Sequence, residues 1–247
     1  IYLPCLIINV QRGGPGLGGI QPSQSDYWQA TKALGHGDFQ LFVLAPSTIQ
    51  EMVDFVPLAF DKAEQYRMPA MILSDGMLGQ MMEPVTLPDA TKPFDREANI
   101  ASKAWATNGT KGKRKRNIVN SLYIQPEELE KLVKERFERY EIIKANEQRA
   151  ESYLTEDADV VVVAFGASSR VSRSAVNAAR AEGIKAGLIR PITLWPFPKK
   201  AIEAVVPTAK VFLDVEMNMG QMIEDVKMVV NGRKPVEFFG RTGGIIP

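Results

Sequence analysis

A glycine-rich stretch near the start of the chain constrains the fold more than any other feature. It covers residues 12–19, between the apolar run 6–10 and a cluster of capping residues at 23–26. The apolar run is short and rich in β-branched residues, which predicts a buried strand, and the capping cluster predicts a helix over 27–34. In an open α/β sheet, a turn between a strand and a helix is where anionic ligands bind.

The glycine spacing allows more than one interpretation. Gly14, Gly16 and Gly19 match the dinucleotide fingerprint, but that fingerprint opens its helix directly, whereas Pro22 delays the helix here. A Walker loop is excluded because no Gly-Lys-Ser/Thr follows. Arg12 stands at the mouth of the turn, and two roles stay open for it. Either its guanidinium binds an anion, or the loop simply turns sharply and leaves Arg12 on the surface.

Strands and helices alternate through the first part of the chain. The pattern predicts strands over 39–45 and 70–74 and a helix over 49–66, in which Pro57 causes either a kink or a shortened first part. Short links between these elements favour a parallel, doubly wound sheet. Asp75 follows the third strand, and a carboxylate that caps a turn is favoured there over a metal ligand.

A second α/β unit is predicted near the C-terminus. Its expected strands cover residues 160–166, 186–190, 211–216 and 236–240. Glu216 ends the third of these strands and either caps the next helix or lines a site, and the pattern favours the cap.

The middle of the chain is irregular until residue 126, where a long amphipathic helix is predicted. The basic run 111–116 lacks interleaved aromatic residues, so a solvated loop or a subunit contact is favoured over nucleic-acid binding. An acidic partner, such as the phosphates of CoA or a ferredoxin, stays open for this run.

Composition excludes several classes of site. A net charge of +1 over 247 residues argues against nucleic-acid binding by the surface as a whole. No apolar run reaches the roughly 18–20 residues that span a bilayer, and no signal peptide opens the chain, so a cytoplasmic protein is expected. Cys5 and His36 are the only residues of their types, too few for an iron–sulfur cluster or a structural zinc site. Cys5 lies in the apolar run and is expected to be a buried, inert thiol.

The residues Val10–Pro15, followed by a second glycine cluster, resemble the signature of alpha subunits of 2-oxoacid:ferredoxin oxidoreductases, particularly the 2-oxoisovalerate (3-methyl-2-oxobutanoate) type. The resemblance continues through residues 41–47, 72–76 and 187–198. It implies a thiamine-diphosphate enzyme that decarboxylates a branched-chain 2-oxo acid, forms an acyl-CoA and reduces ferredoxin. It also implies that the chain is a fragment without the family's N-terminal part, which carries the glutamate that contacts the aminopyrimidine.

The same resemblance implies the domain organisation. We expect the C-terminal part of a pyrimidine-side thiamine-diphosphate domain at residues 1–95, with a parallel sheet. A linker with the long helix follows at 96–154, and a transketolase C-terminal-like α/β domain at 155–247.

For the site, the resemblance implies that Arg12, Gly13, Gly14 and Gln21 bind the substrate, with Arg12 gripping the carboxylate of the 2-oxo acid. No catalytic residue and no metal ligand are expected on the fragment alone, and its cofactor-binding residues stay unknown. Residues 20–22 stand where 2-oxoglutarate enzymes carry a threonine, and this departure favours an aliphatic 2-oxo acid.

The implied partners supply the rest of the chemistry. A beta subunit is expected to anchor thiamine diphosphate and Mg²⁺, and a small subunit to hold the iron–sulfur cluster, with CoA as co-substrate and ferredoxin as acceptor in a dimer or hetero-oligomer. Three alternatives stay open. They are a 2-oxoglutarate- or pyruvate-type subunit, another thiamine-dependent transketolase-like enzyme, and a catalytically silent interaction or scaffold subunit.

Overall fold

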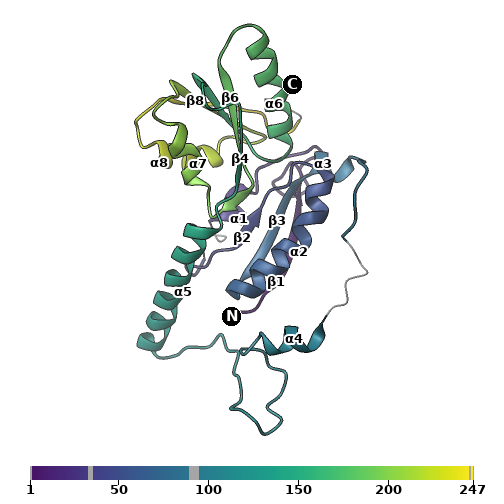
Figure 1. Ribbon diagram of the computed structural model, residues 1–247, viewed down its shortest axis with the longest axis vertical. Coiled ribbons are helices and arrows are strands. Elements are labelled where there is room, and N and C mark those ends of the chain that lie inside the picture. The colour runs from purple at the N-terminus through teal and green to yellow at the C-terminus, as the bar shows by residue number, and fades with distance from the viewer. Residues whose placement is uncertain (1, 33–35, 89–94, 245, 247) are drawn as a thin grey trace.

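The computed structural model describes residues 2–32, 36–88, 95–244 and 246, which form two sheets with helices packed on them (Figure 1). The helices are α1 (Tyr27–Thr31), α2 (Ile49–Tyr66), α3 (Gly76–Gln80), α4 (Arg96–Ala101), α5 (Pro126–Asn146), α6 (Gly166–Ala181), α7 (Lys199–Val205) and α8 (Met222–Val230). The strands are β1 (Cys5–Gln11), β2 (Phe42–Leu44), β3 (Pro69–Asp75), β4 (Ala150–Tyr153), β5 (Val160–Val163), β6 (Ala186–Pro191), β7 (Thr193–Trp195), β8 (Val211–Glu216) and β9 (Val236–Gly240). The predicted α/β class with parallel sheets is confirmed.

The first sheet has the strand order β1-β3-β2-β7. Its first three strands are parallel, and α2 packs on them. The fourth strand, β7, comes from the second half of the chain and pairs antiparallel with β2, with Val43 opposite Trp195. The pattern predicts only a rigid connection between Pro191 and Pro198, because prolines bracket the short strand. A segment distant in sequence therefore completes the first sheet.

The second sheet has the order β4-β6-β5-β8-β9. β6, β5, β8 and β9 are parallel, and β4 adds an antiparallel edge. Helices α6 and α8 pack on this sheet, and β5 is buried as its run of valines predicts. β4 lies within the expected linker 96–154 and β7 belongs to the other sheet, so the expected domain division stays a prediction.

The expectation of a buried first strand is wrong. β1 borders only β3 among the described residues, and apolar side chains on it, such as Ile8 and Val10, are about half exposed. Cys5 is likewise exposed, against the expected buried thiol. An edge strand has a solvent-facing side that hydrophobicity alone does not predict.

Helix α2 has the predicted bounds but a different buried face. The Thr48 side chain accepts a hydrogen bond from the Glu51 N–H and caps the helix, which continues through Pro57. The apolar spacing predicts one buried face made of Met52, Val53, Val56, Phe60 and Ala63. Phe60 is instead exposed, whereas Phe55 and Ala59 are buried.

Helix α5 is long, as predicted, and runs beside the first sheet towards the second (Figure 1). Only its last turns are buried, through Tyr140 and Ile143, and Leu129 and Phe137 are exposed. No helix among residues 2–32, 36–88, 95–244 and 246 combines the length and hydrophobicity needed to cross a membrane.

Candidate functional site

The glycine-rich stretch forms a closed loop at the carboxyl end of β1. The Gly13 N–H donates to Gln21 O at 2.9 Å, and the Gly19 N–H donates to Gly13 O at 2.6 Å. Arg12 and Pro22 form an antiparallel bridge that closes the base. The loop lies at the sheet end where α/β folds bind ligands.

Gly18 is required by this path. Its φ is 44°, and a Cβ built on it would lie 1.8 Å from Gly13 O. Gly14 differs, because a Cβ there meets nothing within 4 Å. The two glycines therefore give a matched pair of positions for testing the loop.

We expect Gly18→Ala to distort the loop and to lower the free energy of unfolding by about 1–3 kcal/mol, because its Cβ cannot coexist with Gly13 O. Gly14→Ala should change that free energy by no more than about 0.5 kcal/mol. Urea unfolding of both variants measures this difference. Equal free energies of unfolding in the two variants would refute the requirement for this loop path.

Arg12 is exposed, and its guanidinium is held against its own loop. Nη1 donates to Leu17 O and, at 3.2 Å, to Gly19 O, and Nη2 donates to Gly16 O at 3.3 Å. A guanidinium has five N–H donors. These contacts involve Nη1 and one hydrogen of Nη2, and they leave Nε–H and the other Nη2 hydrogen as donors for an anion.

The predicted substrate residues thus come together only in part. Arg12, Gly13 and Gln21 meet at the base of the loop, where Gln21 takes part through its backbone oxygen. Gly14 lies farther along the loop, and the Gln21 residue is exposed. Leu17 and Ile20, at the loop surface, are 91% and 79% exposed, although both are apolar.

The segment that leaves the loop is clamped between the two sheets by Gln24, which is fully buried. Its Nε2 donates to Phe165 O at 2.8 Å, and its Oε1 accepts from Ser168 Oγ at 2.7 Å and from the Met217 N–H at 3.0 Å. Asn218 Nδ2 donates to Gln24 O at 2.8 Å. The sequence suggested only a capping residue here, and no pattern signals a long-range clamp.

Asp75 caps two helices at once. Its Oδ1 accepts from the N–H groups of Met77 and Leu78, at 3.1 Å each, at the start of α3. Its Oδ2 accepts from the Ala167 N–H at 2.9 Å, at the start of α6. Burial raises the pKa of Asp75, and these backbone N–H groups oppose that rise. The predicted capping role is confirmed, and it links the two sheets.

Glu216 caps α8 in the same way. Its carboxylate accepts from the N–H groups of Gln221, Met222 and Ile223, and from Asn218 Nδ2 at 2.8 Å. Burial raises the pKa of the neighbouring Asp214 to about 10, and the charge of Glu216 adds to the rise. Asp214 is therefore neutral near pH 7.

Helix α1 is fastened to α8. The Tyr27 hydroxyl donates to Asp225 Oδ2 at 2.6 Å, and Lys32 Nζ lies 2.8 Å from Asp225 Oδ1. The Trp28 N–H donates to Gln221 Oε1 at 2.9 Å. Together with Gln24, these contacts hold the loop's exit against the second sheet.

A buried ion cluster joins the two halves on another side. Arg190 on β6 donates to both oxygens of Glu51 on α2, at 2.8 and 2.9 Å, and through Nε to Glu151 on β4 at 2.9 Å. Arg173 on α6 also binds Glu151. A bidentate pair with little solvent contact fixes the relative position of its two elements.

The described residues do not fit a magnesium–diphosphate site. No group of three or more His, Cys, Asp or Glu side chains that could hold a metal ion occurs in the part of the chain that the structure describes. Asp75 is the carboxylate that the sequence offered as a possible metal ligand, and both of its oxygens accept hydrogen bonds from helix N-termini.

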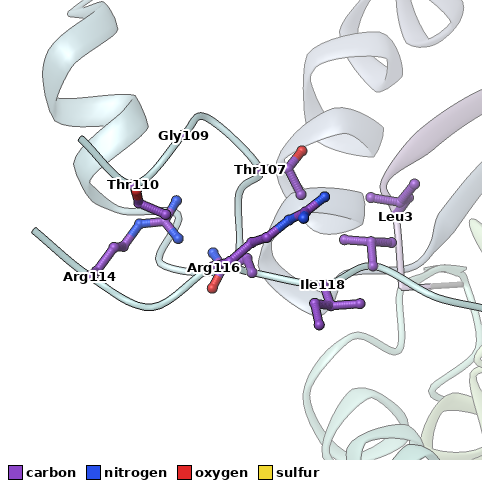
Figure 2. Close-up of a pocket in the computed structure, with 9 residues that line it drawn as sticks. Leu3, Thr107, Gly109, Thr110, Arg114, Arg116 and Ile118 are labelled. Atoms are coloured by element: carbon purple, nitrogen blue, oxygen red, sulfur yellow. The ribbon is translucent and has the colours of Figure 1, made fainter. Parts of the chain in front are cut away.

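The basic run 111–116 lies in an exposed loop below the first sheet (Figure 1). Figure 2 shows Arg114 and Arg116 beside the segment that carries Thr107, Gly109 and Thr110, around a cavity of about 620 Å³. Arg114 Nη2 donates to Asn108 Oδ1 at 2.7 Å and to Ala106 O at 3.0 Å, so part of its hydrogen bonding holds the loop itself.

Two family models match the chain. Residues 1–155 match "Pyruvate flavodoxin/ferredoxin oxidoreductase, thiamine diP-bdg", and residues 158–247 match "Pyruvate:ferredoxin oxidoreductase core domain II".

Curated relatives cover nearly the whole chain. Ketoisovalerate oxidoreductase subunit VorB of Methanothermobacter marburgensis is 45% identical over 98% of this chain, and that of Methanothermobacter thermautotrophicus is 46% identical over 98%. The chain spans 67% of the length of each of these relatives. The 2-oxoglutarate synthase subunit KorA of Methanothermobacter marburgensis is 36% identical, over 98% of this chain and 70% of its own length.

A solved structure has the same fold. The 2-oxoglutarate:ferredoxin oxidoreductase of Magnetococcus marinus, with 2-oxoglutarate, coenzyme A and succinyl-CoA bound, superposes with a TM-score of 0.77 at 25% identity. The match covers 99% of this chain and 46% of that chain.

Proposed function

Because the chain belongs to the pyruvate:ferredoxin oxidoreductase family, we propose that it is a subunit of an enzyme that oxidatively decarboxylates a branched-chain 2-oxo acid to an acyl-CoA, with ferredoxin as the electron acceptor. The observation that carries this proposal is the 45% identity to a ketoisovalerate oxidoreductase subunit over 98% of the chain. The 2-oxoglutarate synthase subunit has lower identity, at 36%, over the same share.

Within this function, Arg12 binds the substrate carboxylate. The loop carbonyls use Nη1 and one hydrogen of Nη2 and do not use Nε–H, so the guanidinium keeps donors for a planar anion. Charge-assisted hydrogen bonds of this kind contribute about 1.5–3 kcal/mol. The substrate is thereby held in one orientation. Gly13 and Gly14 allow close approach of the backbone, and Gln21 closes the base of the loop.

In this proposal, the aliphatic side chain of the substrate packs against the apolar surface of the loop, at Leu17 and Ile20. Leu17 and Ile20 are exposed in the described chain, next to the carbonyls that Arg12 binds. An aliphatic side chain gains free energy by covering such surface, whereas a second carboxylate would be desolvated without a partner. This chemistry favours a branched aliphatic 2-oxo acid over 2-oxoglutarate.

The remaining components belong to other polypeptides in this proposal. A beta subunit anchors thiamine diphosphate and Mg²⁺, a small subunit carries the iron–sulfur cluster, and CoA is the co-substrate of a cytoplasmic hetero-oligomer. The chain is inactive alone. The support on this chain is its lack of a fitting metal-ligand set among the described residues. The division at residues 1–95, 96–154 and 155–247 is part of the same proposal.

Ferredoxin reduction by the purified, assembled enzyme tests the function. With CoA present, kcat/KM for 2-ketoisovalerate should exceed that for 2-oxoglutarate at least tenfold, because only the second substrate brings an extra carboxylate to the apolar surface. Equal or higher kcat/KM for 2-oxoglutarate would reject the branched-chain assignment. Oxidation of no 2-oxo acid would favour a catalytically silent subunit instead.

A further inference from the structure

Three arginines surround one tyrosine ring at the far end of the first sheet from the glycine loop. The guanidinium carbons of Arg67, Arg136 and Arg139 lie 5.8, 5.6 and 4.4 Å from the centroid of the Tyr2 ring. Arg67 follows the last residue of α2, and the other two lie one turn apart on α5. The ring face stabilises each cation by about 0.5–1 kcal/mol, but it does not neutralise the combined charge.

Among the residues that the structure describes, no carboxylate pairs with these arginines. Arg67 Nη2 donates to Tyr2 O and Arg136 Nη1 donates to Gly37 O, both at 3.3 Å. In the same described part, Nε of Arg67 and Nε of Arg139 are buried without a hydrogen-bond partner. Burial lowers the pKa of Arg67, and the charge of Arg139 lowers it further. Within the described part of the chain, the cluster therefore has no counter-charge.

The cluster lines a cavity of about 300 Å³, together with His36 and Gln40. That volume suits a small molecule rather than a folded partner. Gln40 precedes β2 and Met68 precedes β3, so the cavity lies at the amino ends of the parallel strands. Arg12 follows the carboxyl end of the seven-residue strand β1, which spans roughly 20 Å. The cavity is thus separate from the candidate substrate site.

The backbone at Arg67 supports a role for its side chain. Arg67 is the C-cap of α2 with φ 50° and ψ 54°, a left-handed conformation that glycine or asparagine adopts at lower cost. An arginine at this position is not favoured by local conformation. Its guanidinium instead reaches the cluster and also lies 4.9 Å from the Trp105 ring centroid.

We propose that this cavity binds a phosphate group, either free or as a phosphate ester of a small molecule. Three guanidinium groups offer a threefold positive charge and donors in several directions, which match a dianion with three acceptor oxygens. A planar carboxylate carries one charge and is satisfied by a single guanidinium. The site is independent of the proposed 2-oxo acid chemistry.

Calorimetric titration of the assembled full-length protein tests the site, with inorganic phosphate in a chloride buffer at constant ionic strength. The wild-type protein should bind phosphate with a Kd of about 1 mM or lower. Arg139→Gln should weaken this binding at least tenfold, because it removes the guanidinium closest to the ring. Lys131→Gln is the matched control, since its side chain is 80% exposed on the same helix and does not line the cavity, so the Kd should be unchanged.

Acetate and circular dichroism complete the test. Acetate should bind at least tenfold more weakly than phosphate, and both variants should keep the wild-type spectrum. The proposal is overturned by an absence of phosphate binding, by equal binding to the wild type and Arg139→Gln, by equal losses in Arg139→Gln and Lys131→Gln, or by acetate binding as tightly as phosphate. A phosphate ester that competes with phosphate for the site would identify the natural source of the group.

Discussion

Arg12→Ala should raise the KM for 2-ketoisovalerate in the assembled enzyme by about 10- to 150-fold. A single charge-assisted hydrogen bond contributes about 1.5–3 kcal/mol, and each 1.4 kcal/mol corresponds to a factor of ten, so losing the bidentate contact should raise the KM by at least this much. Arg12→Lys keeps the charge but cannot bind a carboxylate bidentately, so its KM should lie between that of the wild type and that of Arg12→Ala. The KM for CoA should stay within about twofold in both variants. An unchanged KM for the 2-oxo acid would show that Arg12 does not bind the substrate.

A second measurement separates carboxylate binding from loop support, because Arg12 also binds three carbonyls of its own loop. The methyl ketone 3-methyl-2-butanone has the acyl side of the substrate without its carboxylate. Its inhibition constant should be the same in the wild type and in Arg12→Ala if the guanidinium acts on the carboxylate. Equal weakening of ketone and substrate would assign Arg12 to loop support alone.

Arg190→Met should lower the free energy of unfolding by about 3 kcal/mol. The Arg190 side chain is 7% exposed and binds both oxygens of Glu51. Its removal leaves the Glu51 carboxylate without this cation, held among the described residues only by the N–H and hydroxyl groups of Ser47. The cost lies at the lower end of the usual 3–5 kcal/mol, since Glu51 is 22% exposed and partly hydrated. Urea unfolding of the full-length protein measures it.

Arg173→Met is the matched control, because Arg173 binds the same Glu151 but is 41% exposed. Pairs at the surface contribute only about 0–1 kcal/mol, so this variant should stay close to the wild type. The double variant Arg190→Met with Glu51→Gln should recover part of the loss, since no uncompensated charge remains. A cost below about 1 kcal/mol for Arg190→Met would contradict the importance of this buried cluster.

The parts of the fold that follow from local pattern were predictable from sequence. β5 and the apolar part of β3 before Ser74 are buried, as their hydrophobic runs predict. Helix α5 begins at Pro126, as the helix-start signals predict. The edge strand was not predictable in this way, because an apolar run does not specify which side of a sheet is covered. β7 was not predicted either, since its three residues lie between prolines and pair with β2 across the chain.

The candidate site shows the same limit. Arg12 and its glycines stand out because a charged residue beside small ones at a strand end is a strong local signal. The contacts of Gln24 with residues more than 140 positions away carry no such signal. The arginine cluster around Tyr2 is likewise assembled by the fold from three separate segments. Such long-range polar contacts are visible only in the three-dimensional structure.

A crystal structure of the assembled enzyme with 2-ketoisovalerate tests the central claim most directly. The account predicts that the substrate carboxylate lies within about 3 Å of Nε and Nη2 of Arg12, with the branched side chain against Leu17 or Ile20. A carboxylate bound by another group, with the Arg12 side chain turned into bulk solvent, would contradict the account.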